Sequence, residues 1–441
     1  MHLEVYTNGR WRTAAQIELG PATAVTIRYL PEYFLDRAIQ YDSRAEQAVS
    51  VNAPVSPIET SYRRWPALFD DLLPVGKARD WWLRRLGIQH LPAAEQQTHL
   101  LAHAVIAPVG NLRIKEAFAE LPTVNNHQRF SMAEVTALEY EFLEFASNRG
   151  ATVGGATGAH GVAPKLLLQL DDQESVLIDA DFAGKPSVAT PYLVKFARNT
   201  RSERDNNILR AEYSYYQVLH ELFKSSAIST MNAEHIKLVT DPATQQSSLW
   251  LPRFDVYQEH GIVHRMGMES IYSILDISAG ANCNHFAVIE ALKERIEPLL
   301  MIPFSTWVTD YVIRDFLNVM FGNTDNHGRN ISFLKKNGQL QLAPIYDFAP
   351  MKADPEFINR TFTWGQPFES GDQINYALIA QQLSDHVNAD QLMAALANIA
   401  KQLCDLPQRL EHYNCPREII EFNPLGFARI KQRLQNCGVM A

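Results

Sequence analysis

The chain is organised around residues 321–330, which read Phe321-Gly322-Asn323-Thr324-Asp325-Asn326-His327-Gly328-Arg329-Asn330. A second run follows after a short turn and ends in Tyr346-Asp347-Phe348. One carboxylate of such a set can accept the proton of an attacking hydroxyl, while a second carboxylate and an amide oxygen hold Mg2+ against a triphosphate. The pattern predicts a phosphoryl-transfer centre, with Asp325 and Asn330 as the catalytic pair and Asn330 and Asp347 as metal ligands.

The surroundings of this loop support the interpretation. An ordinary polar loop would have the same composition, but this one follows an apolar helical pattern, 305–321, and precedes a hairpin pattern over 331–342. The interval from Asp325 to Asn330 is the Asp-to-Asn interval of a protein-kinase catalytic loop, and Asp347 precedes a Phe as the metal-binding Asp of kinases does. The sequence therefore favours a metal-nucleotide site over a structural loop.

Composition limits the class of protein. The chain has 441 residues, of which 20% are charged and 46% apolar, with a net charge of -9. This length fits two or three domains with substantial cores, and the charge argues against a protein that coats nucleic acid or an anionic membrane. The four cysteines have no CxxC spacing and the first residues lack a secretory-signal pattern, so we expect a cytoplasmic protein. The longest uncharged apolar run, 100–112, is too short to span a bilayer.

Local patterns divide the chain into three parts. Residues 1–150 contain short strand patterns and then helices, the last of which is opened by a capping box, Ser131 and Glu134. Residues 151–258 combine strand patterns with one long helix, and residues 259–441 are largely helical. We predict an α+β protein with a two-lobed, kinase-like fold, in which a small β-rich N-terminal subdomain precedes an N-lobe and a mainly helical C-lobe.

A glycine-rich run, 153–165, opens the second part of the chain. Its glycines would let backbone N–H groups approach phosphate oxygens. A flexible linker would have the same composition, and the run matches neither a Walker A loop nor a Rossmann fingerprint. Taken alone, it is weak evidence for a nucleotide site.

A lysine and a glutamate form the next candidate pair. Lys195 lies among apolar residues in the strand pattern 191–196, and Glu212 lies on the apolar face of the helical pattern 204–223. An inward glutamate needs a cation, so we predict that Glu212 pairs with Lys195 and that Lys195 binds phosphates. A lysine at a sheet edge and a glutamate at a helix margin remain the alternatives.

The strand pattern 248–256 occupies the place of a kinase hinge. We take Phe254 and Asp255 as candidate nucleotide-binding residues, since Asp255 could accept hydrogen bonds from ribose hydroxyls. A surface pair of Arg253 with Asp255 would look the same in the sequence. His327 has no metal-ligand partner at a suitable spacing, so we expect it to form hydrogen bonds or to pack.

With these residues together, the chain resembles the HipA family of serine/threonine kinases, best known as toxins of bacterial toxin–antitoxin pairs. The resemblance rests on residues 68–79, 161–165, 253–255, 322–330 and 342–347, with Lys195 and Glu212. It implies ATP and Mg2+ as cofactors, Asp325 as the base that activates a serine or threonine hydroxyl, and nucleotide-binding roles for Gly158 and Gly161.

The resemblance also implies partners. Family members phosphorylate aminoacyl-tRNA synthetases and are held inactive by a helix-turn-helix antitoxin, so DNA would be reached only through the antitoxin. One departure concerns a loop serine that the family often autophosphorylates, because Gly158 stands at that place here. Thr157 is the only hydroxyl between Val153 and Lys165, so autophosphorylation of this loop is either absent or shifted to Thr157.

Two other functions could use the same residues. A metal-dependent nuclease or phosphodiesterase would use the carboxylates to activate water, but the chain has no clear basic stripe and such a function leaves Lys195 unexplained. A catalytically silent, kinase-fold binding protein ranks last, because every catalytic residue type is present.

Overall fold

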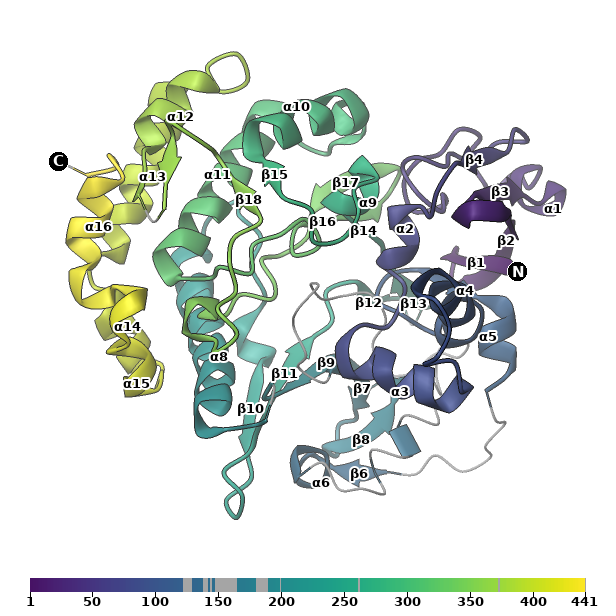
Figure 1. Cartoon of the computed structure of the whole chain (residues 1–441), viewed down its shortest axis with the longest axis horizontal. Helices are drawn as coiled ribbons and strands as arrows, with labels where there is room; N and C mark the ends of the chain where they lie inside the picture. The colour runs from purple at the N-terminus through teal and green to yellow at the C-terminus, as the bar shows by residue number, and fades with distance from the viewer. Residues whose placement is uncertain are drawn as a thin grey trace.

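The structure is a computed structural model that describes residues 1–121, 129–137, 142, 145–146, 165–179, 189–198, 200–260, 262–371 and 373–440. In Figure 1 the N-terminal part, in purple, and the C-terminal helices, in yellow, lie at opposite ends of the molecule. The strands and helices from the middle of the chain lie between them. The predicted glycine-rich run, with Thr157, Gly158 and Gly161, lies outside the described residues.

The N-terminal part is built on a five-stranded sheet in the order β4-β3-β2-β1-β5. Alternate residues of its strands, such as Leu3 and Val5, are buried in one core, as the period-2 pattern predicts. The strands are β1 (His2–Thr7), β2 (Arg10–Leu19), β3 (Val25–Tyr29), β4 (Thr60–Tyr62) and β5 (Leu112–Ile114). The helices of this part are α1 (Pro31–Phe34), α2 (Ala67–Asp70), α3 (Gly76–Leu86), α4 (Ala93–Ala104) and α5 (Lys115–Ala119).

A six-stranded sheet in the order β10-β11-β9-β7-β8-β6 forms the middle of the molecule. Its strands are β6 (Phe130–Ser131), β7 (Lys165–Leu170), β8 (Ser175–Ile178), β9 (Thr190–Phe196), β10 (Lys237–Thr240) and β11 (Ser247–Pro252). The long helix α8 (Glu203–Phe223) packs against β9, β10 and β11. Because β6 pairs with β8, this sheet includes residues from before the predicted junction at residue 150.

The predicted capping box is present at the start of α6 (Met132–Ala137). The backbone N–H of Glu134 donates to Ser131 Oγ at 3.2 Å, and the backbone N–H of Ser131 donates to Glu134 Oε2 at 2.6 Å. Both orphan donors at the helix start are thereby satisfied.

The C-terminal part is mainly helical, and its described residues form four small sheets. Its helices are α9 (Ile271–Leu275), α10 (His285–Ile296), α11 (Phe304–Phe321), α12 (Tyr376–Gln382), α13 (Ala389–Leu403), α14 (Leu406–His412), α15 (Arg417–Ile420) and α16 (Ile430–Asn436). Its strands are β12 (Val256–Glu259), β13 (Ile262–Arg265), β14 (Gly267–Ser270), β15 (Cys283–Asn284), β16 (Ser332–Lys336), β17 (Gln339–Leu342), β18 (Phe362–Thr363), β19 (Glu369–Ser370) and β20 (Gln373–Ile374). The four sheets are β12-β13, β14-β16-β17, β15-β18 and β19-β20.

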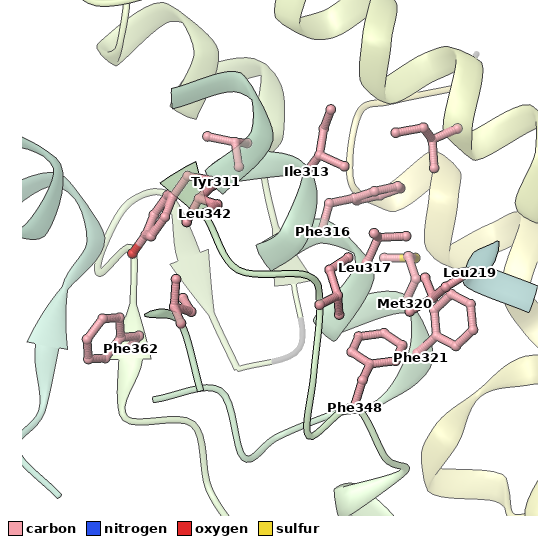
Figure 2. Packing of buried hydrophobic residues seen from close by; sticks show 14 of the residues in the cluster. Leu219, Tyr311, Ile313, Phe316, Leu317, Met320, Phe321, Leu342, Phe348 and Phe362 are labelled. Carbon is pink, nitrogen blue, oxygen red and sulfur yellow. The ribbon is translucent and has the colours of Figure 1, made fainter. Parts of the chain in front are cut away.

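The central element of this part is α11. Figure 2 shows its residues Phe316, Leu317, Met320 and Phe321 packed together with Phe348 in the large hydrophobic core. Because α11 is buried on most of its circumference, its C-terminal end is fixed in position. The loop that follows, residues 323–331, therefore starts from a rigid support.

The predicted fold class is confirmed: a β-rich N-terminal part precedes a two-lobed body whose C-terminal region is helical. One predicted element is wrong in part. The sequence pattern predicts a helix over 425–434, but α16 begins only at Ile430. Gly426, which has a φ of 70°, separates two short 3-10 turns, Asn423–Leu425 and Phe427–Arg429, that precede α16. Among the described residues, no helix combines the length and the apolar character that a bilayer crossing requires.

Candidate phosphoryl-transfer site

The turn that delivers the catalytic loop depends on Gly322. Gly322 caps α11 in the left-handed region with a φ of 71°, and a Cβ at this position would lie 2.3 Å from Leu425 Cδ2. A side chain here would be strained and would also clash. Glycine therefore allows the chain to leave α11 and enter the loop that contains Asp325.

Asp325 lies in a half-buried position with two loop partners. Its carboxylate Oδ1 lies 3.4 Å from His327 Nε2, and its backbone oxygen accepts a hydrogen bond from Asn330 Nδ2 at 2.7 Å. Burial raises the pKa of Asp325 and lowers the pKa of His327. Asp325 and Asn330, predicted as a pair from their spacing, are thus held together by the loop, and His327 packs beside them.

The loop rests on the ring of Tyr272. The rings of His327 and Tyr272 stack with centroids 6.2 Å apart, and the backbone oxygen of Gly328 accepts from the backbone N–H of Tyr272 at 3.4 Å. A Cβ on Gly328 would lie 2.4 Å from Tyr272 Cδ1. Only glycine permits this approach.

The close approach yields a stability prediction. We expect Gly328→Ala to lower the free energy of unfolding by about 1–3 kcal/mol, the usual cost of overpacking. Gly20→Ala is the matched control, because its new Cβ would have no atom nearer than 3.4 Å. Urea denaturation followed by circular dichroism measures both changes, and equal stability of the two variants would contradict the prediction.

Lys195 and Glu212 form the predicted ion pair, with Lys195 Nζ 2.5 Å from Glu212 Oε1. Lys195 lies on β9 and Glu212 on α8, and both side chains are buried. Glu212 Oε1 also accepts from the hydroxyl of Tyr216 at 3.1 Å. The alternatives of an edge lysine and a surface glutamate are therefore wrong.

Asp347 completes this charged cluster. Its carboxylate pairs with Lys195 and lies 3.1 Å from Lys165 Nζ. Burial alone would raise the pKa of Asp347, but the two ammonium groups outweigh burial and hold that pKa below its usual range. Asp347 has a φ of 52°, a left-handed conformation that is uncommon for a residue with a side chain. The strained backbone aims the carboxylate at the lysines.

The two lysines differ in their electrostatic surroundings. Burial lowers the pKa of Lys195 less than its two carboxylate partners, Asp347 and Glu212, raise it. Lys165 has Asp347 as its nearest partner and is repelled by Lys195, so burial dominates and lowers its pKa to about 8. Lys165 was missed as a site residue, although its place directly after the glycine-rich run was the available signal.

The donor set around Asp347 and Asn330 fits a hard divalent cation. Asn330 Oδ1 is buried and has no hydrogen-bond partner among the described residues, which is unusual for an amide oxygen. Carboxylate and amide oxygens are ligands that Mg2+ accepts. Within the described residues no cluster of three or more His, Cys, Asp or Glu side chains could hold a metal, so other ligands would have to be water and phosphate oxygens.

Two adjoining cavities meet at Lys165, Lys195 and Asp347. The first is lined by charged groups, including Asp325 and Arg198, and by several apolar side chains. The second has mainly apolar walls, which include Val109, Leu193, Leu251, Phe254, Met268 and Tyr346. The ring of Phe254 lies 5.8 Å from that of Tyr346. The shapes fit a charged group in the first cavity and a flat apolar group in the second.

Asp255 is held by hydrogen bonds within the protein. Its carboxylate accepts from Arg253 Nε at 3.0 Å and Nη2 at 2.6 Å, and from the backbone N–H of Gly110 at 2.7 Å. Burial would raise the pKa of Asp255, but Arg253 holds it below its usual value. The pair with Arg253 exists, yet it is buried rather than on the surface, and both oxygens already have partners. Asp255 also lines the apolar cavity, and its predicted contact with a ribose hydroxyl stays a prediction.

Two protein-family models match most of the chain. A family model described as the HipA-like C-terminal domain matches residues 157–406, and a model described as the HipA N-terminal domain matches residues 3–115. The chain belongs to the HipA family. The two HipA models cover both the N-terminal sheet and the elements that carry Lys195, Asp325 and Asp347. No curated protein sequence matches the chain.

A solved HipA structure has the same fold as this chain. The HipA protein of the Shewanella oneidensis MR-1 toxin–antitoxin system, solved with HipB and its operator DNA, superposes with a TM-score of 0.66 at 17% identity, covering 99% of this chain and 96% of that chain. The Helicobacter pylori proinflammatory kinase CtkA gives a TM-score of 0.36 at 14% identity, covering 64% of this chain and 89% of that chain. The first likeness supports the HipA fold across nearly the whole chain.

Proposed function

We propose that this HipA-family chain is an ATP- and Mg2+-dependent kinase that phosphorylates a serine or threonine hydroxyl of a protein. One observation carries the proposal: Asp325 and Asp347 line the same cavity as Lys195, whose ammonium group pairs with Glu212. Phosphoryl transfer demands mainly positioning and charge stabilisation from a protein. This cluster supplies both.

Each residue has a distinct task in this proposal. Bound Mg2+ supplies positive charge that neutralises the phosphates. Asp347 and Asn330 hold that ion through oxygen atoms, and Lys195 binds the phosphates while Glu212 keeps its ammonium group in place. Asp325 accepts the proton of the acceptor hydroxyl. The apolar cavity around Phe254 holds the adenine.

We further propose that the chain is the toxin of a toxin–antitoxin pair. The solved HipA to which it is similar was crystallised with HipB and operator DNA, which supports an antitoxin protein as partner and DNA contact through that partner. The family resemblance suggests an aminoacyl-tRNA synthetase as the substrate class. The antitoxin and such a synthetase would both be cytoplasmic proteins, so we propose the cytoplasm as the compartment of this chain.

Transfer of labelled phosphate tests the kinase proposal. Purified chain is incubated with γ-labelled ATP and Mg2+, alone and with a lysate, and labelled proteins are separated and their phosphosites mapped. We expect label on a serine or threonine of one lysate protein, or on the chain itself, which would also decide whether Thr157 is modified. Cleavage of DNA with Mg2+ in the absence of ATP, with no label transferred, would overturn the proposal in favour of a nuclease.

A further inference from the structure

The short helix α9 is the support of the catalytic loop. All five residues of α9 are buried. Beyond the stacking of Tyr272 on His327, the backbone N–H of Ile271 donates to the backbone oxygen of Ile331 at 3.0 Å. The loop from His327 to Ile331 thus follows the surface of α9. A displacement of α9 would displace the residues that flank Asn330.

The N-terminal domain, which is the part built on the five-stranded sheet, contacts both ends of α9. At its start, Asp71 accepts from the backbone N–H of Ser270 at 2.9 Å and from its hydroxyl at 2.8 Å. At its end, Asn52 Nδ2 donates to the backbone oxygen of Ile274 at 2.9 Å. Helix α2, which precedes Asp71, lies beside α9 (Figure 1). Arg295 of α10 donates to the same oxygen of Ile274 at 2.8 Å, so the C-terminal end of α9 is held from both parts of the chain.

A buried carboxylate next to α9 ties the same domain to β14. Glu269 accepts from Ser50 Oγ at 2.6 Å and from the backbone N–H of Val51 at 3.0 Å. It also accepts from Ser273 Oγ of α9 at 2.8 Å and pairs with Lys335, whose Nζ lies 2.5 Å away. A buried charge of this kind fixes geometry, because every displacement leaves a carboxylate without its hydrogen bonds.

One contact reaches the catalytic loop directly. Arg329 Nη2 lies 3.6 Å from Asp70 Oδ2, and both side chains are largely buried. Asp70 is itself held by Trp65, whose indole N–H donates to Oδ1 at 3.0 Å. Arg329 is the residue before Asn330, so a charge from the N-terminal domain faces the position next to the proposed metal ligand.

We propose that the N-terminal domain is a positioning element of the phosphoryl-transfer centre, with Asp71 acting through α9 and Asp70 acting through Arg329. Neither residue contacts substrate or nucleotide, and both are positioning residues. The activity part of this inference rests on the proposed function. The structural part, that these contacts keep the catalytic loop in place, does not.

Two isosteric substitutions test the proposal in the full chain. Asp71→Asn leaves only one acceptor oxygen for the two donors of Ser270, and Asp70→Asn removes the charge that faces Arg329 while the hydrogen bond from Trp65 is kept. Asp80→Asn, at an exposed position on α3, is the matched control. Hydrogen exchange of the amides in residues 322–331 is measured without nucleotide, and thermal unfolding is measured beside it.

We expect exchange of these loop amides to become at least about tenfold faster in Asp71→Asn, and faster in Asp70→Asn, because a local opening loses its restraint. Exchange in α13 and α16 should stay as in the wild type. With MgATP, we expect the rate of phosphate transfer to fall about tenfold while the dissociation constant for MgATP changes less than twofold, a loss of positioning rather than of binding.

The outcomes separate this inference from the proposed function. Unchanged loop exchange in both variants, or faster exchange spread evenly over the whole chain, would overturn the positioning role. A wild type that transfers no phosphate would refute the proposed function, while selective loop exchange in the variants would still support the positioning role. If Asp71→Asn fails to fold, Asp70→Asn decides alone.

Discussion

Asp325→Asn is expected to slow phosphate transfer by about 10²–10⁴-fold, the usual contribution of a positioned general base. The amide has the shape of the carboxylate but cannot take the proton of the acceptor hydroxyl. Asn330 donates to the backbone oxygen of residue 325, not to its side chain, so the loop should keep its shape. Calorimetric titration should therefore give an unchanged affinity for MgATP. The rate at which label is transferred from ATP measures the loss of activity.

Asp385→Asn is the control for this prediction, because Asp385 is exposed in the same lobe. The control should transfer phosphate as the wild type does. Transfer that persists in Asp325→Asn at the wild-type rate would remove Asp325 from its role as base. Loss of MgATP affinity in that variant would instead indicate a structural role.

Lys195→Met is expected to lower the free energy of unfolding of the nucleotide-free protein by about 3–5 kcal/mol, the usual cost of leaving a buried charge without its partner. Lys195 serves two carboxylates, those of Glu212 and Asp347, and Lys165 reaches only Asp347. Methionine keeps the apolar stem and removes the charge. The variant should also bind MgATP poorly, because the proposed phosphate contact is lost.

The decrease in the free energy of unfolding caused by Lys195→Met should become larger as the pH rises. In the wild type the pKa of Asp347 lies below its unfolded value, so its contribution to stability is present above about pH 4 and is lost as pH falls further. Without Lys195 the ionised carboxylate of Asp347 loses one of its two cations, and its pKa rises. The variant should thus be closest to the wild type at pH 5 and furthest from it at pH 8, as measured by urea denaturation.

Lys237→Met is the matched control for that experiment. Lys237 forms an exposed pair with Glu174 at 3.1 Å, and such pairs contribute about 0–1 kcal/mol. If Lys195→Met lowered the free energy of unfolding no more than Lys237→Met does, the role of Lys195 in stabilising the buried carboxylates would be contradicted.

The sequence was sufficient to find the elements of the site and one long-range contact. The interval from Asp325 to Asn330 placed both residues on one loop, and the helical period of α8 turned Glu212 inward. An inward glutamate needs a cation, and the apolar strand pattern around Lys195 together with the kinase lysine–glutamate pair predicted the contact with Lys195 that the structure contains. The roles of these residues towards ATP and Mg2+ stay predictions.

Other features depend on tertiary packing that no local pattern contains. The interval between Asp255 and Arg253 is the same for a surface pair and for a buried one, so the hydrogen bond from Gly110 to Asp255 could not be foreseen. The left-handed φ of Asp347 is imposed by its surroundings. The contacts of Asp71 with Ser270 join residues 199 positions apart, and nothing in either segment marks the other.

The central claim is that the cavity lined by Lys195, Asp325 and Asp347 binds a metal-nucleotide complex with its terminal phosphate facing Asp325. A crystal structure of the full chain with a non-hydrolysable ATP analogue and Mn2+, recorded for anomalous scattering, tests it most directly. Our account predicts a Mn2+ peak at coordination distance from Asp347 and Asn330 Oδ1, phosphates on Lys195, and adenine beside Phe254. A nucleotide bound elsewhere, or Mn2+ bound without Asp347, would contradict it.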